Sequence, residues 1–125
     1  MHRHRRLLRI ALGAIALVVA ITLVTYLAVD RDSAERLLAA SFSFHSPPDP
    51  QLDRAGYFER CWPHAGNGTE FEFVRLLEAG DEVVVTYEGT RPDGTRFRNT
   101  EVLRFDDGDR IAEAEVYFGW DLPER

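Results

Sequence analysis

The chain has 125 residues, enough for one domain, and 45% of them are hydrophobic, which predicts a folded chain rather than a disordered one. Its net charge of −6 combines a basic N-terminal segment with an acidic remainder, and an acidic surface disfavours nucleic-acid binding by the body of the protein. The single cysteine, Cys61, excludes an internal disulfide and a multi-cysteine metal site.

The first feature along the chain is an apolar run. Residues 10–29 (IALGAIALVVAITLVTYLAV) carry no charge, and as a helix they would span about 30 Å, the thickness of the hydrocarbon core of a bilayer. Arginines precede the run and aspartates follow it, an asymmetry that places the N-terminus in the cytoplasm. The sequence therefore predicts a single-pass membrane protein whose C-terminal domain lies outside the cytoplasm.

Two alternatives to a membrane anchor remain open at this point. A signal peptide cleaved after Ala20 would cut the apolar run in half. A run that instead forms the first, buried helix of the domain would leave the protein in the cytoplasm. The predicted division of the chain is a basic tail at residues 1–6, a transmembrane helix at 7–29 and a folded domain at 30–125.

Helical patterns dominate the part of the chain that follows. Asp32 precedes a predicted helix at residues 33–40, and the alternating sequence SFSFHS predicts a short strand at 41–46. After a proline-rich loop, apolar side chains at spacings of three and four predict a second helix at 52–62, with Asp53 at its N-cap.

From Thr69 onward, apolar and polar residues alternate. Four strands joined by short turns are expected, at residues 71–77, 82–90, 96–105 and 110–120. This order predicts an antiparallel meander bent around the second helix, in an α+β fold. One face of the last strand is apolar and is expected in the core: Ala112, Ala114, Val116, Phe118 and Trp120.

Four segments together resemble a known family: FSFHSPPD, YFERCWP, DEVVVTYEGTRPDGTRFRNTEVLRF and DGDRIAEAEVYFGWDLP. Their order is similar to that of the SnoaL-like branch of the nuclear transport factor 2-like superfamily, over about residues 26–123. The resemblance implies a cone-like curved antiparallel sheet around a pocket, with packed helices at its wide end and, here, one apolar helix before it. It also implies a homodimer through the outer sheet face. Isomerases, cyclases, dehydratases and transport adaptors share this fold, so the fold alone does not give the function.

The third strand of the meander holds the main candidate site. Phe97, Asn99, Glu101 and Leu103 share one of its faces. If this face lines the cone, Asn99 and Glu101 are polar groups in an apolar cavity, as expected of a ligand pocket. A carboxyl group there would have a raised pKa and would serve as a general acid or base, which makes Glu101 the best catalytic candidate. In the alternative arrangement the face points outward, and Glu101 is solvated or paired with an arginine.

Four more side chains are candidates for ligand contact: Tyr87 as a hydrogen-bond donor, Tyr57 and Trp62 as apolar walls, and His45 near Asp49. Each also has a plain structural interpretation, in the core for Tyr87 and on a surface loop for His45. Cys61 with His64 would be a nucleophile pair, although packing is the simpler explanation of that cysteine. The pattern of residues predicts no metal site and no cofactor.

Three functions fit these features. The first is a membrane-anchored domain that binds a small hydrophobic molecule. The second is an enzyme of the isomerase, cyclase or dehydratase type that uses Glu101 as acid or base. The third is a non-catalytic module that dimerises or binds a protein partner.

Overall fold

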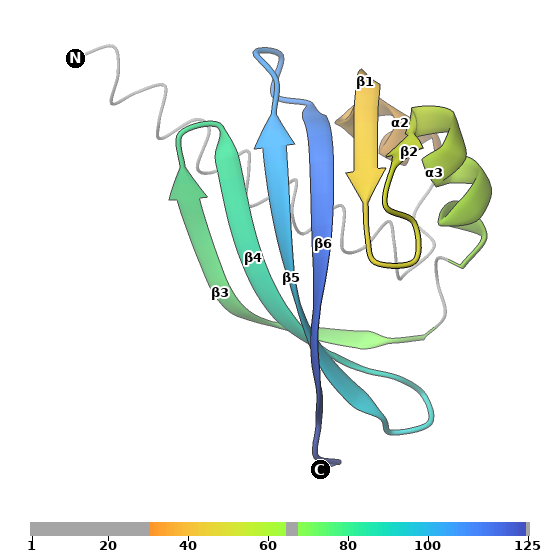
Figure 1. Cartoon of the computed structure of the whole chain (residues 1–125), viewed down its shortest axis with the longest axis vertical. Helices are drawn as coiled ribbons and strands as arrows, with labels where there is room; N and C mark the ends of the chain where they lie inside the picture. Colours follow the sequence, from red (N-terminus) through yellow and green to blue (C-terminus); the bar gives the residue numbers. More distant parts are fainter. Residues whose placement is uncertain (1–30, 65–67, 125) are drawn as a thin grey trace.

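The computed structural model of the chain describes residues 31–64 and 68–124 (Figure 1). The predicted basic tail at 1–6 and the apolar run at 7–29 lie outside the described residues. Within the described ranges, no helix is long and apolar enough to cross a membrane.

Two short helices and six strands make up the described chain, together with one 3-10 turn. In chain order they are α2 (Arg31–Leu37), β1 (Leu38–His45), β2 (Leu52–Asp53), α3 (Arg54–Arg60), η1 (Trp62–His64), β3 (Glu70–Ala79), β4 (Glu82–Thr90), β5 (Arg96–Phe105) and β6 (Ile111–Leu122). The first helix is shorter than predicted, because the chain turns into β1 at Leu38, which pairs with Ile111 of β6. Pairing within the sheet here overrides the helix preference of the Leu-Leu-Ala-Ala sequence.

The strands form one bent sheet in the order β2-β1-β6-β5-β4-β3. Strands β3 to β6 are antiparallel neighbours in sequence order, which confirms the predicted meander. The expectation of a wholly antiparallel sheet is wrong at one place, since β1 joins β6 in parallel. Figure 1 shows α2 and α3 gathered beside β1 and β2, where they cover one end of the sheet.

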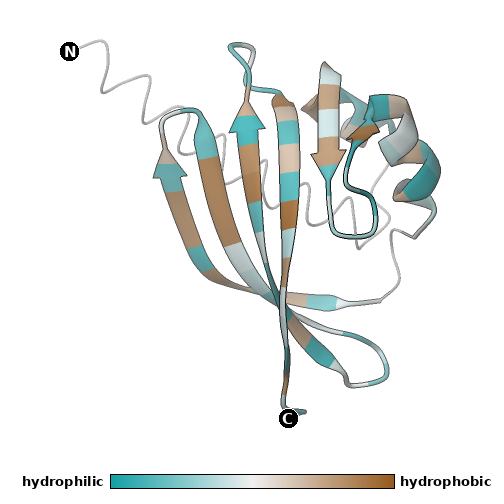
Figure 2. Ribbon diagram, viewed as in Figure 1, coloured by the Kyte–Doolittle hydropathy of each residue, from teal (hydrophilic) through white to brown (hydrophobic). Residues whose placement is uncertain are grey.

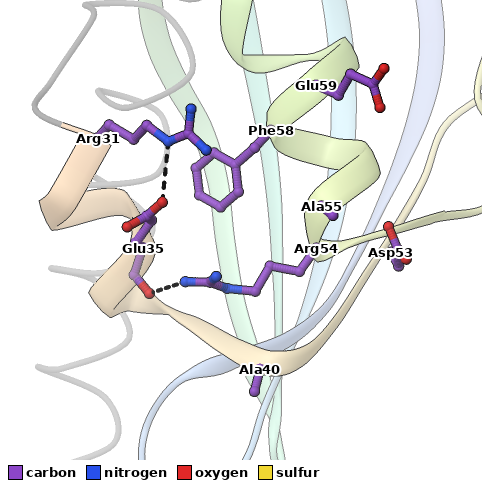
Figure 3. Close-up of a pocket in the computed structure, with 8 residues that line it drawn as sticks. All are labelled: Arg31, Glu35, Ala40, Asp53, Arg54, Ala55, Phe58 and Glu59. Atoms are coloured by element: carbon purple, nitrogen blue, oxygen red, sulfur yellow. Dashed lines mark hydrogen bonds and ion pairs between the residues drawn. The ribbon is translucent and has the colours of Figure 1, made fainter.

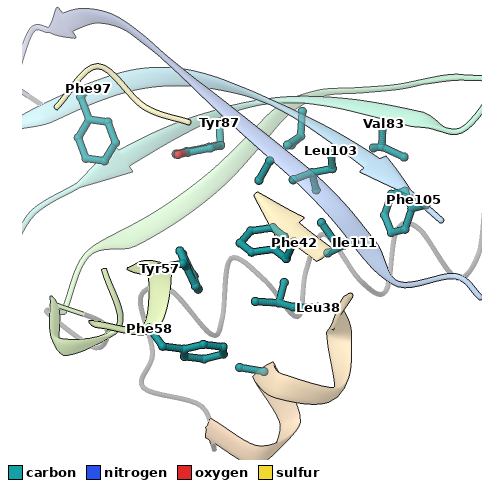
Figure 4. Packing of buried hydrophobic residues seen from close by; sticks show 13 residues of the cluster. Leu38, Phe42, Tyr57, Phe58, Val83, Tyr87, Phe97, Leu103, Phe105 and Ile111 are labelled. Carbon is teal, nitrogen blue, oxygen red and sulfur yellow. The ribbon is translucent and has the colours of Figure 1, made fainter. Parts of the chain in front are cut away.

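The core lies between the inner face of this sheet and α3 (Figure 4). Val83, Val85 and Leu103 are at most 1% exposed on the sheet side, and Tyr57 and Phe58 of α3 pack against that side. Burying each such aliphatic side chain contributes about 1.5–3 kcal/mol. The hydropathy colouring in Figure 2 shows the apolar stretch of β4 that provides part of this surface.

The predicted N-cap of α3 is confirmed, although the helix spans Arg54–Arg60 rather than the predicted 52–62, because Leu52–Asp53 form β2 and Trp62 begins η1. Asp53 is its N-cap, and the Asp53 carboxylate accepts a hydrogen bond of 2.7 Å from the Gly56 N–H. Asp32, by contrast, lies within the first turn of α2 rather than before it. The cap at Asp53 sets the direction of α3 and so presents Tyr57 and Phe58 to the sheet.

A bulge interrupts the pairing of β5 with β6. Phe118 stands opposite Asn99, but Asp121 stands opposite Phe97, so β6 contains one extra residue. The extra residue turns Trp120 to the outer face, where its ring lies 5.5 Å from the guanidinium of Arg98. The prediction of core positions for Phe118 and Trp120 is wrong, since these side chains are 56% and 63% exposed, although Phe118 still faces inward opposite Asn99.

Gly119 cannot be replaced by a larger residue without disturbing the bulge. A Cβ atom at this position would lie 2.2 Å from the backbone oxygen of Arg98, and a backbone atom cannot move aside without disturbing the pairing. We expect Gly119→Ala to lower the free energy of unfolding by about 1–3 kcal/mol, measured by urea denaturation. Gly108→Ala is the matched control, because its Cβ would meet only Asp106 Oδ1 at an ordinary 3.4 Å. Equal losses in the two variants would contradict this account of the bulge.

Candidate functional site

A cavity of about 250 Å³ lies between α3 and the inner face of the sheet. Its walls are mostly apolar and come from β1, α3 and β6: Leu38, Phe42, Phe44, Tyr57, Ala114, Val116 and Phe118. Two polar side chains of β5, Asn99 and Glu101, also line it. The cavity thus combines an apolar wall with a few convergent polar groups, the usual composition of a small-molecule site.

Glu101 is the most strongly perturbed carboxyl group of the cavity. It faces inward because its strand neighbour two positions along, Leu103, is fully buried on the same face. The residues directly opposite it on β4 and β6 are Val85 and Val116. Glu101 keeps some accessible surface where it borders the cavity, but protein atoms surround the carboxyl on its other sides.

Burial raises the pKa of Glu101 from 4.5 to about 7. Desolvation is the cause, and among the described residues no charged or hydrogen-bonding partner offsets it. The carboxylic acid and the carboxylate are therefore both populated near neutral pH. The outward-facing alternative for this residue does not match the structure, since Glu101 points into the cavity and has no arginine beside it.

Asn99 provides a second polar group about 7 Å farther along the same face of β5. Its side chain is 8% exposed, and its amide oxygen accepts a long hydrogen bond of 3.4 Å from the Gly119 N–H. Because an N–H can donate only to the oxygen end of the amide, the NH₂ end is left to donate elsewhere. The inner face of β5 therefore offers one amide donor and one carboxyl group to a bound molecule.

An ion pair stands at the rim of the cavity. Arg60 Nε lies 2.7 Å from Asp49 Oδ1, joining the end of α3 to the proline-rich loop. Cys61 lies beside them, and burial, with a smaller contribution from Asp49, raises the pKa of its thiol to about 11. The thiol is thus protonated at neutral pH, which makes Cys61 a poor nucleophile. The side chain of its predicted partner, His64, lies outside the described part of the structure.

The predicted contact residues fall into three groups in the structure. Tyr57, Asn99 and Glu101 line the cavity. Tyr87 and Leu103 lie in the core behind it, 1% and 0% exposed (Figure 4).

Phe97, His45 and Trp62 form the third group, away from this cavity. Phe97 lines a neighbouring hollow instead. His45 follows the cavity-lining Phe44 on β1 and so points the other way, with its Nδ1 2.8 Å from the carbonyl oxygen of Pro50. Trp62 packs on Phe58, with 5.9 Å between the ring centroids.

Several residues that line the cavity were not predicted from the sequence. Phe42 and Phe44 alternate along β1 as a cavity wall requires, so their signal was present but could not be told from that of a core strand. Arg60 and Asp49 carried no signal, because their pairing depends on how the proline-rich loop returns to α3.

A larger and more open hollow of about 610 Å³ lies between α2 and α3 (Figure 3). Its two arginines are already engaged. Arg31 is paired with Glu35 at 3.1 Å, and Arg54 donates to the backbone oxygen of Glu35 at 2.8 Å. The two guanidinium groups also lie 4.8 and 5.4 Å from the ring centroid of Phe58. These contacts hold α2 against α3, so we assign the candidate site to the smaller cavity.

Metal-ligating side chains do not gather anywhere in residues 31–64 or 68–124 in groups of three or more.

Comparison with known structures supports the fold. A provisionally named polyketide cyclase from Acidithiobacillus ferrooxidans superposes with a TM-score of 0.64 at 22% identity, covering 84% of this chain and 87% of the other. A provisionally named ketosteroid isomerase from Kribbella flavida gives 0.61 at 19% identity, covering 75% and 69%. A nuclear transport factor 2-like protein of unknown function from Mesorhizobium loti gives 0.57 at 25% identity, covering 68% and 74%.

No curated protein matches the sequence at a significant level. The SnoaL-like domain family, however, matches residues 23–114, which include the last part of the apolar run and all of the strands up to the middle of β6. The match covers well over half of the chain. The protein belongs to the SnoaL-like domain family.

Proposed function

We propose that this protein binds a small, largely apolar molecule in the 250 Å³ cavity and that Glu101 and Asn99 receive its polar group. The observation that carries the proposal is the buried carboxyl of Glu101, which has no partner among the described residues and stands in an apolar cavity. A polar group in such a place costs free energy unless something hydrogen-bonds to it. A bound molecule with a carbonyl or hydroxyl oxygen would supply that bond.

The size of the cavity limits the occupant. A volume of about 250 Å³ lies just below the usual range of ligand pockets, which begins near about 300 Å³. The aromatic side chains of Phe42, Phe44 and Tyr57 would contact the apolar body of the molecule. Tyr57 is held in place by edge contacts to Phe42 and Phe58, so this wall is formed before a ligand arrives.

A second candidate function is catalysis of the isomerase, cyclase or dehydratase type. The specific observation in its favour is the pKa of about 7, the value best suited to proton transfer near neutral pH. In this reaction the Glu101 carboxylate would take a proton from a carbon next to a carbonyl group, and the Asn99 NH₂ would donate to the carbonyl oxygen. Fold neighbours provisionally named as a cyclase and an isomerase agree with this reaction class.

The raised pKa of Glu101 predicts how the free energy of unfolding depends on pH. The folded pKa of about 7 lies above the unfolded value of 4.5, so the contribution of this group is fully present below pH 4.5 and is lost as the pH rises through 7. Glu101→Gln removes this loss. We expect its free energy of unfolding, relative to the wild type, to grow by at most about 3 kcal/mol between pH 4.5 and 8.5, because hydration from the cavity reduces the full effect.

Urea denaturation of the full chain across this pH range measures the difference. Glu78→Gln is the matched control, since it makes the same chemical change at an exposed position on β3, outside the cavity. A Glu101→Gln difference that is flat from pH 4.5 to 8.5 would show that the carboxyl is hydrated and ionises normally.

A cavity-filling variant tests ligand binding directly. Val116→Trp places a large side chain in the cavity wall, so a small molecule that co-purifies with the wild-type chain should be lost from the variant. Val84→Trp makes the same change on the outer face of the neighbouring part of the sheet and should keep the molecule. Native mass spectrometry of the three full-length proteins reads the bound mass. Retention of the same mass by Val116→Trp would place the binding site elsewhere.

We also propose that residues 7–29 anchor the protein in a membrane, with the domain on the far side from the cytoplasm. The uncharged run behind four arginines supports this proposal. A periplasm-dependent reporter fused after Arg125 in a bacterial host should be active, and the protein should sediment with membranes. Activity of a cytoplasm-dependent reporter, with the protein in the soluble fraction, would instead assign the run to the domain itself.

A further inference from the structure

We propose that the ligand site continues from the 250 Å³ cavity into a second hollow, and that Phe118 is the side chain that determines how long a ligand can be. This inference rests on the proposed binding function. It assigns a ligand class to the site: an elongated molecule with an apolar body, a carbonyl or hydroxyl oxygen at one end and a second, neutral polar group at the other.

The second hollow has a volume of about 290 Å³ and adjoins the first. Asn99 and Phe118 line both cavities, so these two side chains form the partition between them. A molecule that passed the partition would have roughly twice the space of one confined to the first cavity. The partition is therefore the place where ligand length is decided.

Phe118 is poorly held for an aromatic residue on the inner face of a sheet. It stands opposite Asn99, yet 56% of its surface is exposed. A side chain with so few packed neighbours changes its rotamer at little cost. The ring can thus swing aside for a long ligand and cover part of its apolar body.

The bulge in β6 gives the second hollow its own chemistry. The extra residue brings Asp121 back to the inner face opposite Phe97, where it lines the hollow. Arg91 lines it too, with its guanidinium 4.4 Å from the ring centroid of Phe97. A hydroxyl or amide at the distal end of a ligand can accept from Arg91 and donate to Asp121, whereas either charge alone would be repelled by one of them.

The experiment uses two methyl ketones with a photoreactive diazirine at the far end of the chain, one of six carbons and one of twelve. Each is bound to the full-length protein in lipid nanodiscs, irradiated, and its attachment site is mapped by peptide mass spectrometry. With the wild type, the short ketone should label residues around the first cavity. The long ketone should label the second hollow, between residues 91 and 97 or 119 and 121.

Variants of Phe118 give the decisive comparison. Phe118→Trp should weaken binding of the long ketone about tenfold more than binding of the short ketone, and it should remove the label of the long ketone from the second hollow. Phe118→Ala should strengthen binding of the long ketone relative to binding of the short one. Tyr117→Ala is the matched control, because Tyr117 is an aromatic residue with 54% exposure on the outer face, next in sequence. This variant should leave the binding and labelling of both ketones unchanged.

Two outcomes would overturn the extended site, and only one of them would also overturn the proposed binding function. If both ketones label only the first cavity and the Phe118 variants change them equally, the extended site is wrong and the proposed binding function stands. If neither ketone gives saturable labelling of the first cavity, the proposed function is wrong and the extended site is wrong with it.

Discussion

The extra residue in β6 decides which side chains at the end of the last strand, beyond Phe118, face inward. Without it, strict alternation would carry Phe118 and Trp120 inward together. With it, Gly119 passes within contact distance of the Arg98 backbone and its N–H reaches the Asn99 amide. The same step sends Trp120 outward onto Arg98. The orientation of Asn99, one of the two polar groups of the site, therefore depends on a backbone irregularity in the neighbouring strand.

Glu101 depends on a different balance. Keeping a carboxyl among Val85, Val116 and Leu103 costs free energy whenever it is ionised, and the core must offset that cost. A stability requirement alone would favour an apolar residue at this position, so the carboxyl is not explained by folding. The neighbouring arginines of β5, Arg96 and Arg98, point to the outer face and pair with Glu88 there. The alternation of the strand thus keeps the arginines of β5 on the face opposite Glu101.

Particular residues show how far the sequence predicts this structure. Alternation along β5 was enough to place Asn99, Glu101 and Leu103 on the inner face, because a period of two has only two registers and one of them buries apolar side chains. The cap at Asp53 was equally local and equally predictable. The outward orientation of Trp120 could not be predicted, because the only sequence sign of the bulge is Gly119, and a glycine is also common at the end of a strand. The parallel pairing of β1 with β6 joins residues about seventy positions apart, and no local pattern reports such a contact. The Arg60–Asp49 ion pair at the rim could not be predicted either, because it depends on how the proline-rich loop returns to α3.

The proton on Glu101 also separates the two candidate functions. A carbonyl oxygen only accepts hydrogen bonds, so a bound ketone prefers the carboxylic acid and raises the pKa of Glu101 further above 7. Ketone affinity should then be highest below pH 7 and decline above it. A catalytic base works in the opposite sense, because proton abstraction requires the carboxylate and its rate rises through pH 7. A ligand whose affinity falls over the same pH range in which its turnover rises would be a substrate, and one whose affinity falls without any turnover would be cargo. Glu101→Gln distinguishes the same two cases, since the neutral amide still donates to a carbonyl but cannot accept a proton from carbon.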